Sequence, residues 1–282
     1  MLLVYKPPGE TPYQIVQKIQ SLPQYHDAKI GYAGRLDPMA EGLLLLLVDE
    51  ENKKRKTYER LKKRYVFTML CGIATDSYDL LGLITQSKRI ANFKQVQKKI
   101  AAELPRFVGK HIQQYPPYSS RRVDGKPLFY WAREGKIDTV TLPSKKIEIH
   151  TLSLSHMNVV AATKLKNYIL TSIENVQGDF RQKLIHAGWE NYFAQHQDST
   201  NHLLVACAIS CSSGTYVRQL VHDIGSHIQL PLTAYAITRT NIGKYSLKDL
   251  VRKGEKLDMI DLFKDKQPLG RLKNRRNSKR TR

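Results

Sequence analysis

A run of six aliphatic residues, Leu43 to Val48, follows directly on a glycine-rich loop, and this pairing constrains the fold more than any other feature. The run lies between Gly42 and Asp49, and its length suits a strand buried on both faces better than a helix. The loop before it reads GYAGRLDPMAEG and places Asp37 ahead of a proline, whose ring fixes φ. We therefore expect Asp37 on a stiff loop against the core, where a catalytic group is well held.

An alternative interpretation makes Asp37 purely structural. Aspartate before proline is common at turns and at helix N-termini, because its side chain accepts a hydrogen bond from a nearby backbone N–H. On the dipeptide alone this interpretation is the stronger one, so features elsewhere in the chain must decide between the two.

An excess of basic residues indicates a polyanionic partner. The 46 Lys and Arg outnumber 25 Asp and Glu, for a formal net charge of +21. Residues 267–282 hold seven of these cations and no acid, so the rest of the chain still carries +14. Nucleic acid is the first candidate partner. A membrane surface is the second, but no apolar stretch approaches 18 residues and no lipidation motif is present.

A second basic segment runs from Lys53 to Arg64, with eight Lys or Arg against Glu59 alone. Such a run is ordinarily the solvated face of a helix. This one leads directly into Tyr65, and we favour a role facing RNA phosphates.

Cysteine usage predicts buried thiols in a reducing compartment. Cys71, Cys207 and Cys211 are odd in number and lack metal-ligand spacing. The N-terminal residues form too short an apolar stretch for a signal peptide, so we expect a cytoplasmic protein.

Helical and strand patterns alternate without the regularity of βαβ units, which predicts an α+β fold. Strand patterns cover residues 2–5, 43–48, 65–70, 146–154, 203–210 and 235–240. Helices are predicted from Pro12 after a Thr11 cap, at 92–104, at 127–134, at 215–228 and from Ser246. Residues 157–202 are the least regular, although Phe180, Leu184, Ile185, Trp189 and Phe193 follow an amphipathic helical pattern.

Seven short motifs, in a fixed order, resemble those of the TruB family of tRNA pseudouridine synthases. They are KPPGET at 6–11, GYAGRLDPMAEG at 31–42, KRY at 63–65, TDSYDLLG at 75–82, PPYSSRRVDGKPLF at 116–129, SCSSGTYVR at 210–218 and RTNIG at 239–243. Each motif is weak alone, but this number in this order is specific.

The resemblance implies a fold and a reaction. The fold would be that of a pseudouridine synthase, with a mixed, mainly antiparallel sheet, flanking helices and a catalytic cleft. The reaction would isomerise uridine to pseudouridine without a cofactor, at position 55 in the T arm of tRNA. By similarity Asp37 is the catalytic carboxylate, acting as nucleophile or as base. A glycoside hydrolase would ordinarily use two carboxylates, and Glu41 is the only second acid nearby in the sequence.

Three more residues gain roles from the resemblance. Tyr65 would stack on the extruded base and is a candidate for moving the C5 proton; the alternative is a half-buried strand tyrosine. Arg218 would pair with Asp37 and hold that carboxylate ionised; the alternative is an ordinary arginine in the first turn of a helix. Tyr216 would pack beside the pocket.

Further positions in the matching motifs are expected to bind substrate: Lys6, Tyr32, Arg35, Leu36, Lys63, Arg64 and Arg122. Two of them depart from the family pattern. Tyr32 stands where the family has histidine, and a tyrosine can stack but carries no positive charge near neutral pH. Arg35 resembles the related RsuA and RluA groups, and would either fill the gap left by the extruded base or bind phosphate.

The resemblance also suggests how the chain is divided. Residues 1–265 would form the catalytic domain of a monomer, with an insertion at 157–202 and a basic, disordered tail at 266–282 in place of the family's C-terminal PUA-type domain. Two alternatives remain open: a synthase with another RNA target, and a catalytically silent RNA-binding or RNA-folding protein. The presence of Asp37, Tyr65 and Arg218 together argues against the silent protein.

Overall fold

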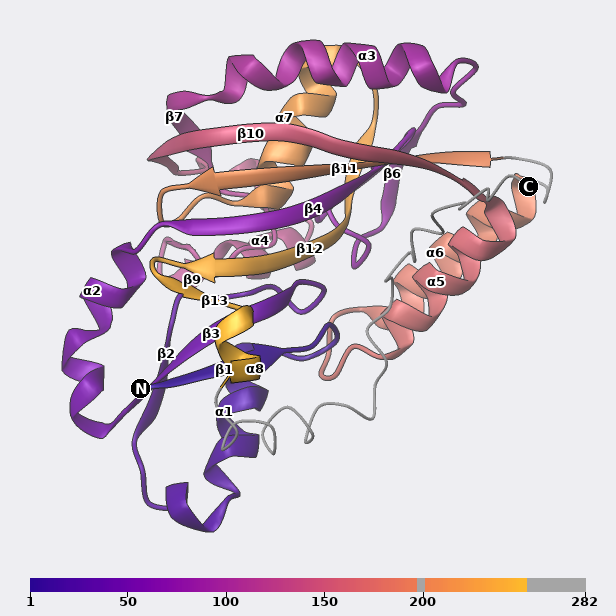
Figure 1. Cartoon of the computed structure of the whole chain (residues 1–282). Helices are drawn as coiled ribbons and strands as arrows, with labels where there is room; N and C mark the ends of the chain where they lie inside the picture. The colour runs from indigo at the N-terminus through magenta and orange to yellow at the C-terminus, as the bar shows by residue number, and fades with distance from the viewer. Residues whose placement is uncertain (197–200, 253–282) are drawn as a thin grey trace, which may run out of the picture.

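The computed structural model describes residues 1–196 and 201–252, and within these one large sheet crosses the molecule (Figure 1). Its strands run in the order β1-β3-β12-β4-β11-β10-β7, while β2 pairs with β3 and β13 with β12. The bounds are β1 Leu2–Lys6, β2 Ile30–Ala33, β3 Glu41–Val48, β4 Lys63–Cys71, β7 Gly109–Gln114, β10 Ser144–Ala161, β11 Asn201–Cys211, β12 Leu232–Ile242 and β13 Tyr245–Ser246. All pairings are antiparallel except that of β3 with β12. The predicted mixed, mainly antiparallel sheet is confirmed.

Helices and short hairpins surround this sheet. The helices are α1 Pro12–Gln20, α2 Arg55–Arg60, α3 Phe93–Glu103, α4 Leu128–Arg133, α5 Ala162–Glu174, α6 Gln182–Gln195, α7 Val217–Ile228 and α8 Lys248–Arg252. Two small hairpins pair β5 Ile73–Thr75 with β6 Ile84–Ser87, and β8 Arg122–Val123 with β9 Lys126–Pro127. The α+β class is therefore confirmed. None of the helices in the described ranges is long and apolar enough to cross a membrane.

The aliphatic run predicted as a buried strand forms β3, and both of its faces are covered. Leu44 and Leu46 pack with α1, whereas Leu43, Leu45 and Leu47 face a separate cluster that includes Ile242. At Gly42 the strand meets the backbone of Arg239 so closely that a Cβ would collide with it, and φ is +113°. Only glycine fits such a position.

Side chains of alternate residues in the central strands belong to two different hydrophobic cores, because successive side chains point to opposite faces of a sheet. Met69 and Val205 point toward α3 and α7, which cover one face. Leu70 and Leu204 point the other way, toward α5 and α6 and the fully buried Trp189. The two pairs of helices, α3 with α7 and α5 with α6, are thus packed against opposite faces of the same central strands.

The predicted helices occur, with local differences. Thr11 caps α1 in a capping box with Gln14, as expected. Helix α7 begins at Val217, two residues later than predicted, because Thr215 Oγ1 donates a hydrogen bond to Ser212 O and the Tyr216 N–H donates to Gln113 Oε1. These bonds keep both residues in the preceding turn.

The irregular segment 157–202 contains the end of β10, helices α5 and α6 and the start of β11. The amphipathic pattern forms α6, although Leu184 is exposed rather than buried. Whether this segment is an insertion stays a prediction, as does the division of the chain at residue 265. The predicted tail at 266–282 lies outside the described residues.

Candidate active site

The loop that carries Asp37 is held by backbone contacts. The Ala40 N–H donates to Asp37 O at 3.1 Å, and the Gly9 N–H donates to Pro38 O at 2.8 Å. Beneath the loop the fully buried Lys6 donates from Nζ to the carbonyl oxygens of Pro38 at 3.2 Å and Ala40 at 2.5 Å. Burial lowers the pKa of Lys6 to about 7, although the carboxylates of Asp37 and Glu10 oppose this. Lys6, which we expected to bind substrate, instead lies under the loop as its support.

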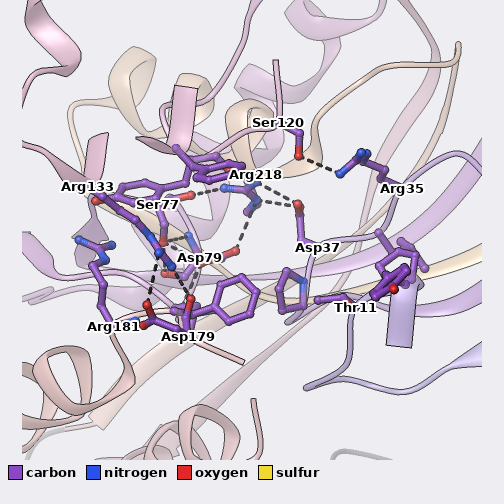
Figure 2. A pocket seen from close by; sticks show the side chains of 18 of the residues that line it. Thr11, Arg35, Asp37, Ser77, Asp79, Ser120, Arg133, Asp179, Arg181 and Arg218 are labelled. Carbon is purple, nitrogen blue, oxygen red and sulfur yellow. Dashed lines mark hydrogen bonds and ion pairs between the residues drawn. The ribbon is translucent and has the colours of Figure 1, made fainter. Parts of the chain in front are cut away.

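The Asp37 side chain accepts two hydrogen bonds from Arg218, across 181 positions of sequence. Arg218 Nε lies 2.8 Å from Asp37 Oδ2, and Nη2 lies 3.1 Å from Oδ1 (Figure 2). This bidentate pair fixes the plane of the carboxylate. In the described residues Asp37 caps no helix, and its side chain bonds Arg218 instead. Its catalytic role stays a prediction. The carboxylate is one-third exposed, whereas Arg218 is 3% exposed.

Arg218 is held on its other sides by two loops. Its Nη1 donates to Ser77 O at 2.5 Å and its Nη2 to Tyr118 O at 3.3 Å, while Nε lies 3.4 Å from Asp79 Oδ2. Burial disfavours the charged guanidinium, but the carboxylates of Asp37 and Asp79 outweigh this and raise the pKa of Arg218. The arginine therefore stays charged.

Asp79 is the second acid of the site, and the sequence interpretation missed it. It is buried, accepts a hydrogen bond from Ser77 Oγ at 2.7 Å, and has its pKa raised by burial against the opposing effect of Arg218. Glu41, the acid we had noted, is bound elsewhere, by the hydroxyls of Tyr5 and Thr238. The signal for Asp79 was present in the motif TDSYDLLG, but no role had been drawn from it.

Two cavities meet at Asp37. The first hollow, of about 430 Å³, extends toward α1, α4 and the connection between α5 and α6 (Figure 2). The second hollow, of about 650 Å³, extends toward α2 and β4. Both are lined by Arg35, Leu36, Asp37, Tyr118 and Ser120. Asp37 can therefore reach a group held on either side.

Tyr65 lies on β4 and lines the second hollow with Asp37. Burial raises the pKa of Tyr65 to about 12, and the nearby Arg239 guanidinium opposes this shift. Arg239 is fully buried and donates hydrogen bonds to Leu43 O at 2.8 Å and Arg35 O at 3.0 Å. It thus ties the loop that carries Asp37 to β3, a role that the sequence did not reveal because its partners are backbone oxygens.

Part of the predicted basic segment lines the second hollow. Lys56, Arg60 and Lys63 do so, and Lys145 joins them from β10. Burial and the neighbouring Arg239 lower the pKa of Lys63 to about 8. Arg64 lines neither hollow, because successive residues of a strand face opposite sides.

The remaining predicted residues take different positions. Tyr216 lines the second hollow and packs edge-on against Tyr115, while Tyr32 lines the first. Arg35 donates to Ser120 Oγ at 3.0 Å and stands with its guanidinium 5.9 Å from the centre of the Tyr32 ring. Arg122 is exposed on the β8–β9 hairpin and lines neither hollow. Within the described ranges no cluster of His, Cys, Asp and Glu could hold a metal ion.

Comparison with known proteins gives consistent matches. The family described as TruB family pseudouridylate synthase (N terminal domain) matches residues 23–178. A tRNA pseudouridine synthase B from Lactobacillus delbrueckii subsp. bulgaricus is 29% identical over 94% of this chain and 75% of its own length. The protein of the same name from Lactobacillus gasseri is 31% identical over 89% of this chain and 71% of its own length. Among solved structures, a Cbf5–Nop10–Gar1 complex aligns at a TM-score of 0.49 and 16% identity, covering 86% of this chain and 49% of the other.

Proposed function

Because this chain belongs to the TruB family of pseudouridylate synthases, we propose that it isomerises a uridine of tRNA to pseudouridine. The observation that supports this most directly is the bidentate contact of Arg218 with Asp37 at the junction of two hollows. Tyr65 lies in the second of these hollows. A carboxylate, its fixed cation and an aromatic ring are thus gathered from three distant motifs.

Asp37 is the group that acts on the sugar–base junction. The isomerisation breaks the bond between N1 and C1′, turns the uracil and forms a bond from C5 to C1′. The C5 proton is then lost and N1 ends protonated, so no atom is gained or lost overall. One carboxylate suffices as nucleophile or base, and Arg218 fixes its direction.

Tyr65 supports the uracil while it rotates between the two bonds. A uracil held in the second hollow would stack on the Tyr65 ring, as extruded bases stack on aromatic side chains. Its hydroxyl is the candidate for moving the C5 proton. Its pKa, raised by burial to about 12, keeps that hydroxyl protonated at neutral pH, so it would accept a proton only as it passes its own to a neighbour.

We place the target uridine in the T arm, at position 55. Support comes from family membership and from the cations of the second hollow, which would hold RNA phosphates on both sides of an extruded nucleotide. Arg35, which lines both hollows and lies beside the Tyr32 ring, is suited to fill the gap left in the stack together with Tyr32. Extrusion costs a few kcal/mol, which phosphate contacts offset.

We further propose that residues 1–265 act as one catalytic domain, as a monomer in the cytoplasm. The three cysteines are buried and free, which fits a reducing compartment.

The test compares the wild-type protein with Asp37→Asn and Tyr65→Phe. We expect Asp37→Asn to lose pseudouridine formation while its tRNA affinity stays within about threefold, since the carboxylate acts in chemistry and the cations in binding. Tyr65→Phe keeps the stacking ring and should lose most of the rate. Substantial turnover by Asp37→Asn would contradict the assignment.

Mapping the modified positions separates the alternatives. Pseudouridine in ribosomal RNA instead of tRNA would indicate another target, whereas tight tRNA binding without any modification by the wild-type protein would indicate a silent RNA-binding protein.

A further inference from the structure

The connection between α5 and α6, residues 175–181, has no part in the chemistry proposed above. Nevertheless Asp179, Phe180 and Arg181 line the first hollow beside Asp37. Figure 2 shows Asp179 and Arg181 on the same side of this hollow as Asp79 and Arg133. A segment that packs its helices on a distant part of the sheet therefore reaches the catalytic centre.

Arg181 makes the most specific contact of this connection. Its Nη1 lies 2.9 Å from Asp76 Oδ2 and its Nη2 lies 3.3 Å from Asp76 Oδ1. Its guanidinium also lies over the ring of Tyr118, 4.3 Å from the ring centre, and the Tyr118 hydroxyl donates to Asp76 Oδ2 at 3.0 Å. Both charged side chains are mostly buried, at 19% and 24% exposure. A planar, stacked and bidentate arginine fixes its partners more firmly than a point charge would.

Asp76 and Tyr118 belong to the two segments that hold Arg218. Ser77, the next residue after Asp76, accepts a hydrogen bond from Arg218 through its carbonyl oxygen, and Tyr118 does the same. Arg181 therefore fixes, from outside, the two backbone groups that orient the partner of Asp37.

The same connection also supports the loop on the other side of Asp37. The Gln177 N–H donates to Gly9 O at 2.9 Å, and the Gly9 N–H donates to Pro38 O at 2.8 Å. Gly9 approaches so closely that a Cβ there would lie 2.6 Å from Asn175 O. Residues 175–181 thus contact Gly9, which bonds the loop that carries Asp37, and, through Arg181, the network that orients Asp37.

The backbone of Arg181 is unusual as well. It has φ of 65° and ψ of 25°, a left-handed conformation that is uncommon for residues other than glycine. Such a conformation persists where the surrounding contacts determine it. Here it directs the side chain at Asp76 immediately before α6 begins.

We propose that Arg181 is a positioning residue for the isomerisation, and that the connection between α5 and α6 holds Arg218 and Pro38 in place around Asp37. The inference rests on the proposed function, because its effect is measured on pseudouridine formation. The competing role for Arg181 is direct contact with an RNA phosphate.

The experiment measures single-turnover pseudouridine formation at saturating enzyme, tRNA affinity and thermal unfolding. Arg181→Gln should lower the rate constant about tenfold, since small errors in position reduce catalysis, while tRNA affinity stays close to that of the wild type and the variant remains folded at the assay temperature. Lys183→Gln removes an exposed charge two residues further along, at the start of α6, and is the matched control, expected to match the wild type. A full rate for Arg181→Gln, or a loss confined to affinity, would overturn the proposal.

A double-mutant cycle keeps the proposal testable even if the single variants are less stable than the wild type. If Arg181 acts through Asp76, the combined Arg181→Gln and Asp76→Asn variant should be no slower than the slower single variant. Arg181→Lys should regain part of the rate. Strictly multiplicative losses would overturn the proposal. An inactive wild-type protein would refute the proposed function instead, so the two failures are distinguishable.

Discussion

The two hollows on either side of Asp37 differ in charge although they share five lining residues. In the described part of the chain, the second hollow is lined by seven cations and two acids: Arg35, Lys56, Arg60, Lys63, Arg121, Lys145 and Arg239 against Asp37 and Glu59. The first is nearly balanced, with Arg35, Arg133, Arg181 and Arg218 against Asp37, Asp79 and Asp179. We propose a division of roles between them: the second hollow would attract a polyanion, and the first would orient Asp37.

The strongest test of this division is Arg218→Lys. Lysine keeps the charge but cannot make two parallel hydrogen bonds, so Asp37 loses its fixed orientation. We expect the single-turnover rate constant to fall about a hundredfold with tRNA affinity nearly unchanged. Thermal unfolding of both proteins controls for stability. If affinity falls as far as the rate, the first hollow also binds RNA and the division is wrong.

A smaller, opposite effect is expected in the second hollow. Replacing Lys56 and Arg60 by Gln should weaken tRNA binding several-fold and make it less dependent on salt, because fewer counterions are released. The single-turnover rate constant at saturating enzyme should stay the same. The measurement is the slope of log tRNA affinity against log salt concentration for this double variant. The control is a double variant with Lys98→Gln and Lys99→Gln on α3. An unchanged slope would show that this wall does not contact RNA.

The smallest expected effect concerns Lys63 and pH. Its pKa, lowered to about 8 by burial, means that Lys63 is charged below pH 8 and loses its proton as pH rises through that value. Affinity for tRNA should therefore decline modestly between pH 7 and pH 9. Lys63→Arg, which stays charged, should remove the decline, as should Lys63→Gln at a lower affinity. A decline that persists in Lys63→Arg would assign the titration to another group.

The sequence predicted the parts of this site that rest on motifs and local pattern. Asp37 after two glycines and before the β3 run, Arg218 near the start of α7 and Tyr65 at the start of β4 all follow from local order. That Asp37 and Arg218 lie together could be predicted only from the family resemblance, because no local pattern brings together residues 181 positions apart.

Other parts of the site could not be predicted from motifs or local pattern. Arg239 binds carbonyl oxygens, and Arg181 binds an aspartate 105 positions away. Neither pairing has a sequence signature, because it depends on how separate elements pack. Lys6 shows the converse: a basic residue in a motif suggests RNA, yet the fold buries it beneath a loop. Charge alone does not say which way a lysine faces.

The parallel pairing of β3 with β12 has a consequence for how the protein is made. Thr238 and Arg239 align with Glu41 and Gly42, whereas β2 pairs with Leu45 to Val48 along the same edge. The first two residues of β3 therefore lack their partner on this edge until almost two hundred further residues have been synthesised. At ribosomal speeds of roughly 5–20 residues per second, that interval is on the order of 10–40 seconds. During this interval Arg239, which bonds Leu43 O and Arg35 O in the folded protein, is not yet available to fix the loop before β3. We expect the loop that carries Asp37 to be among the last parts of the protein to become ordered, because Arg239 is synthesised so much later.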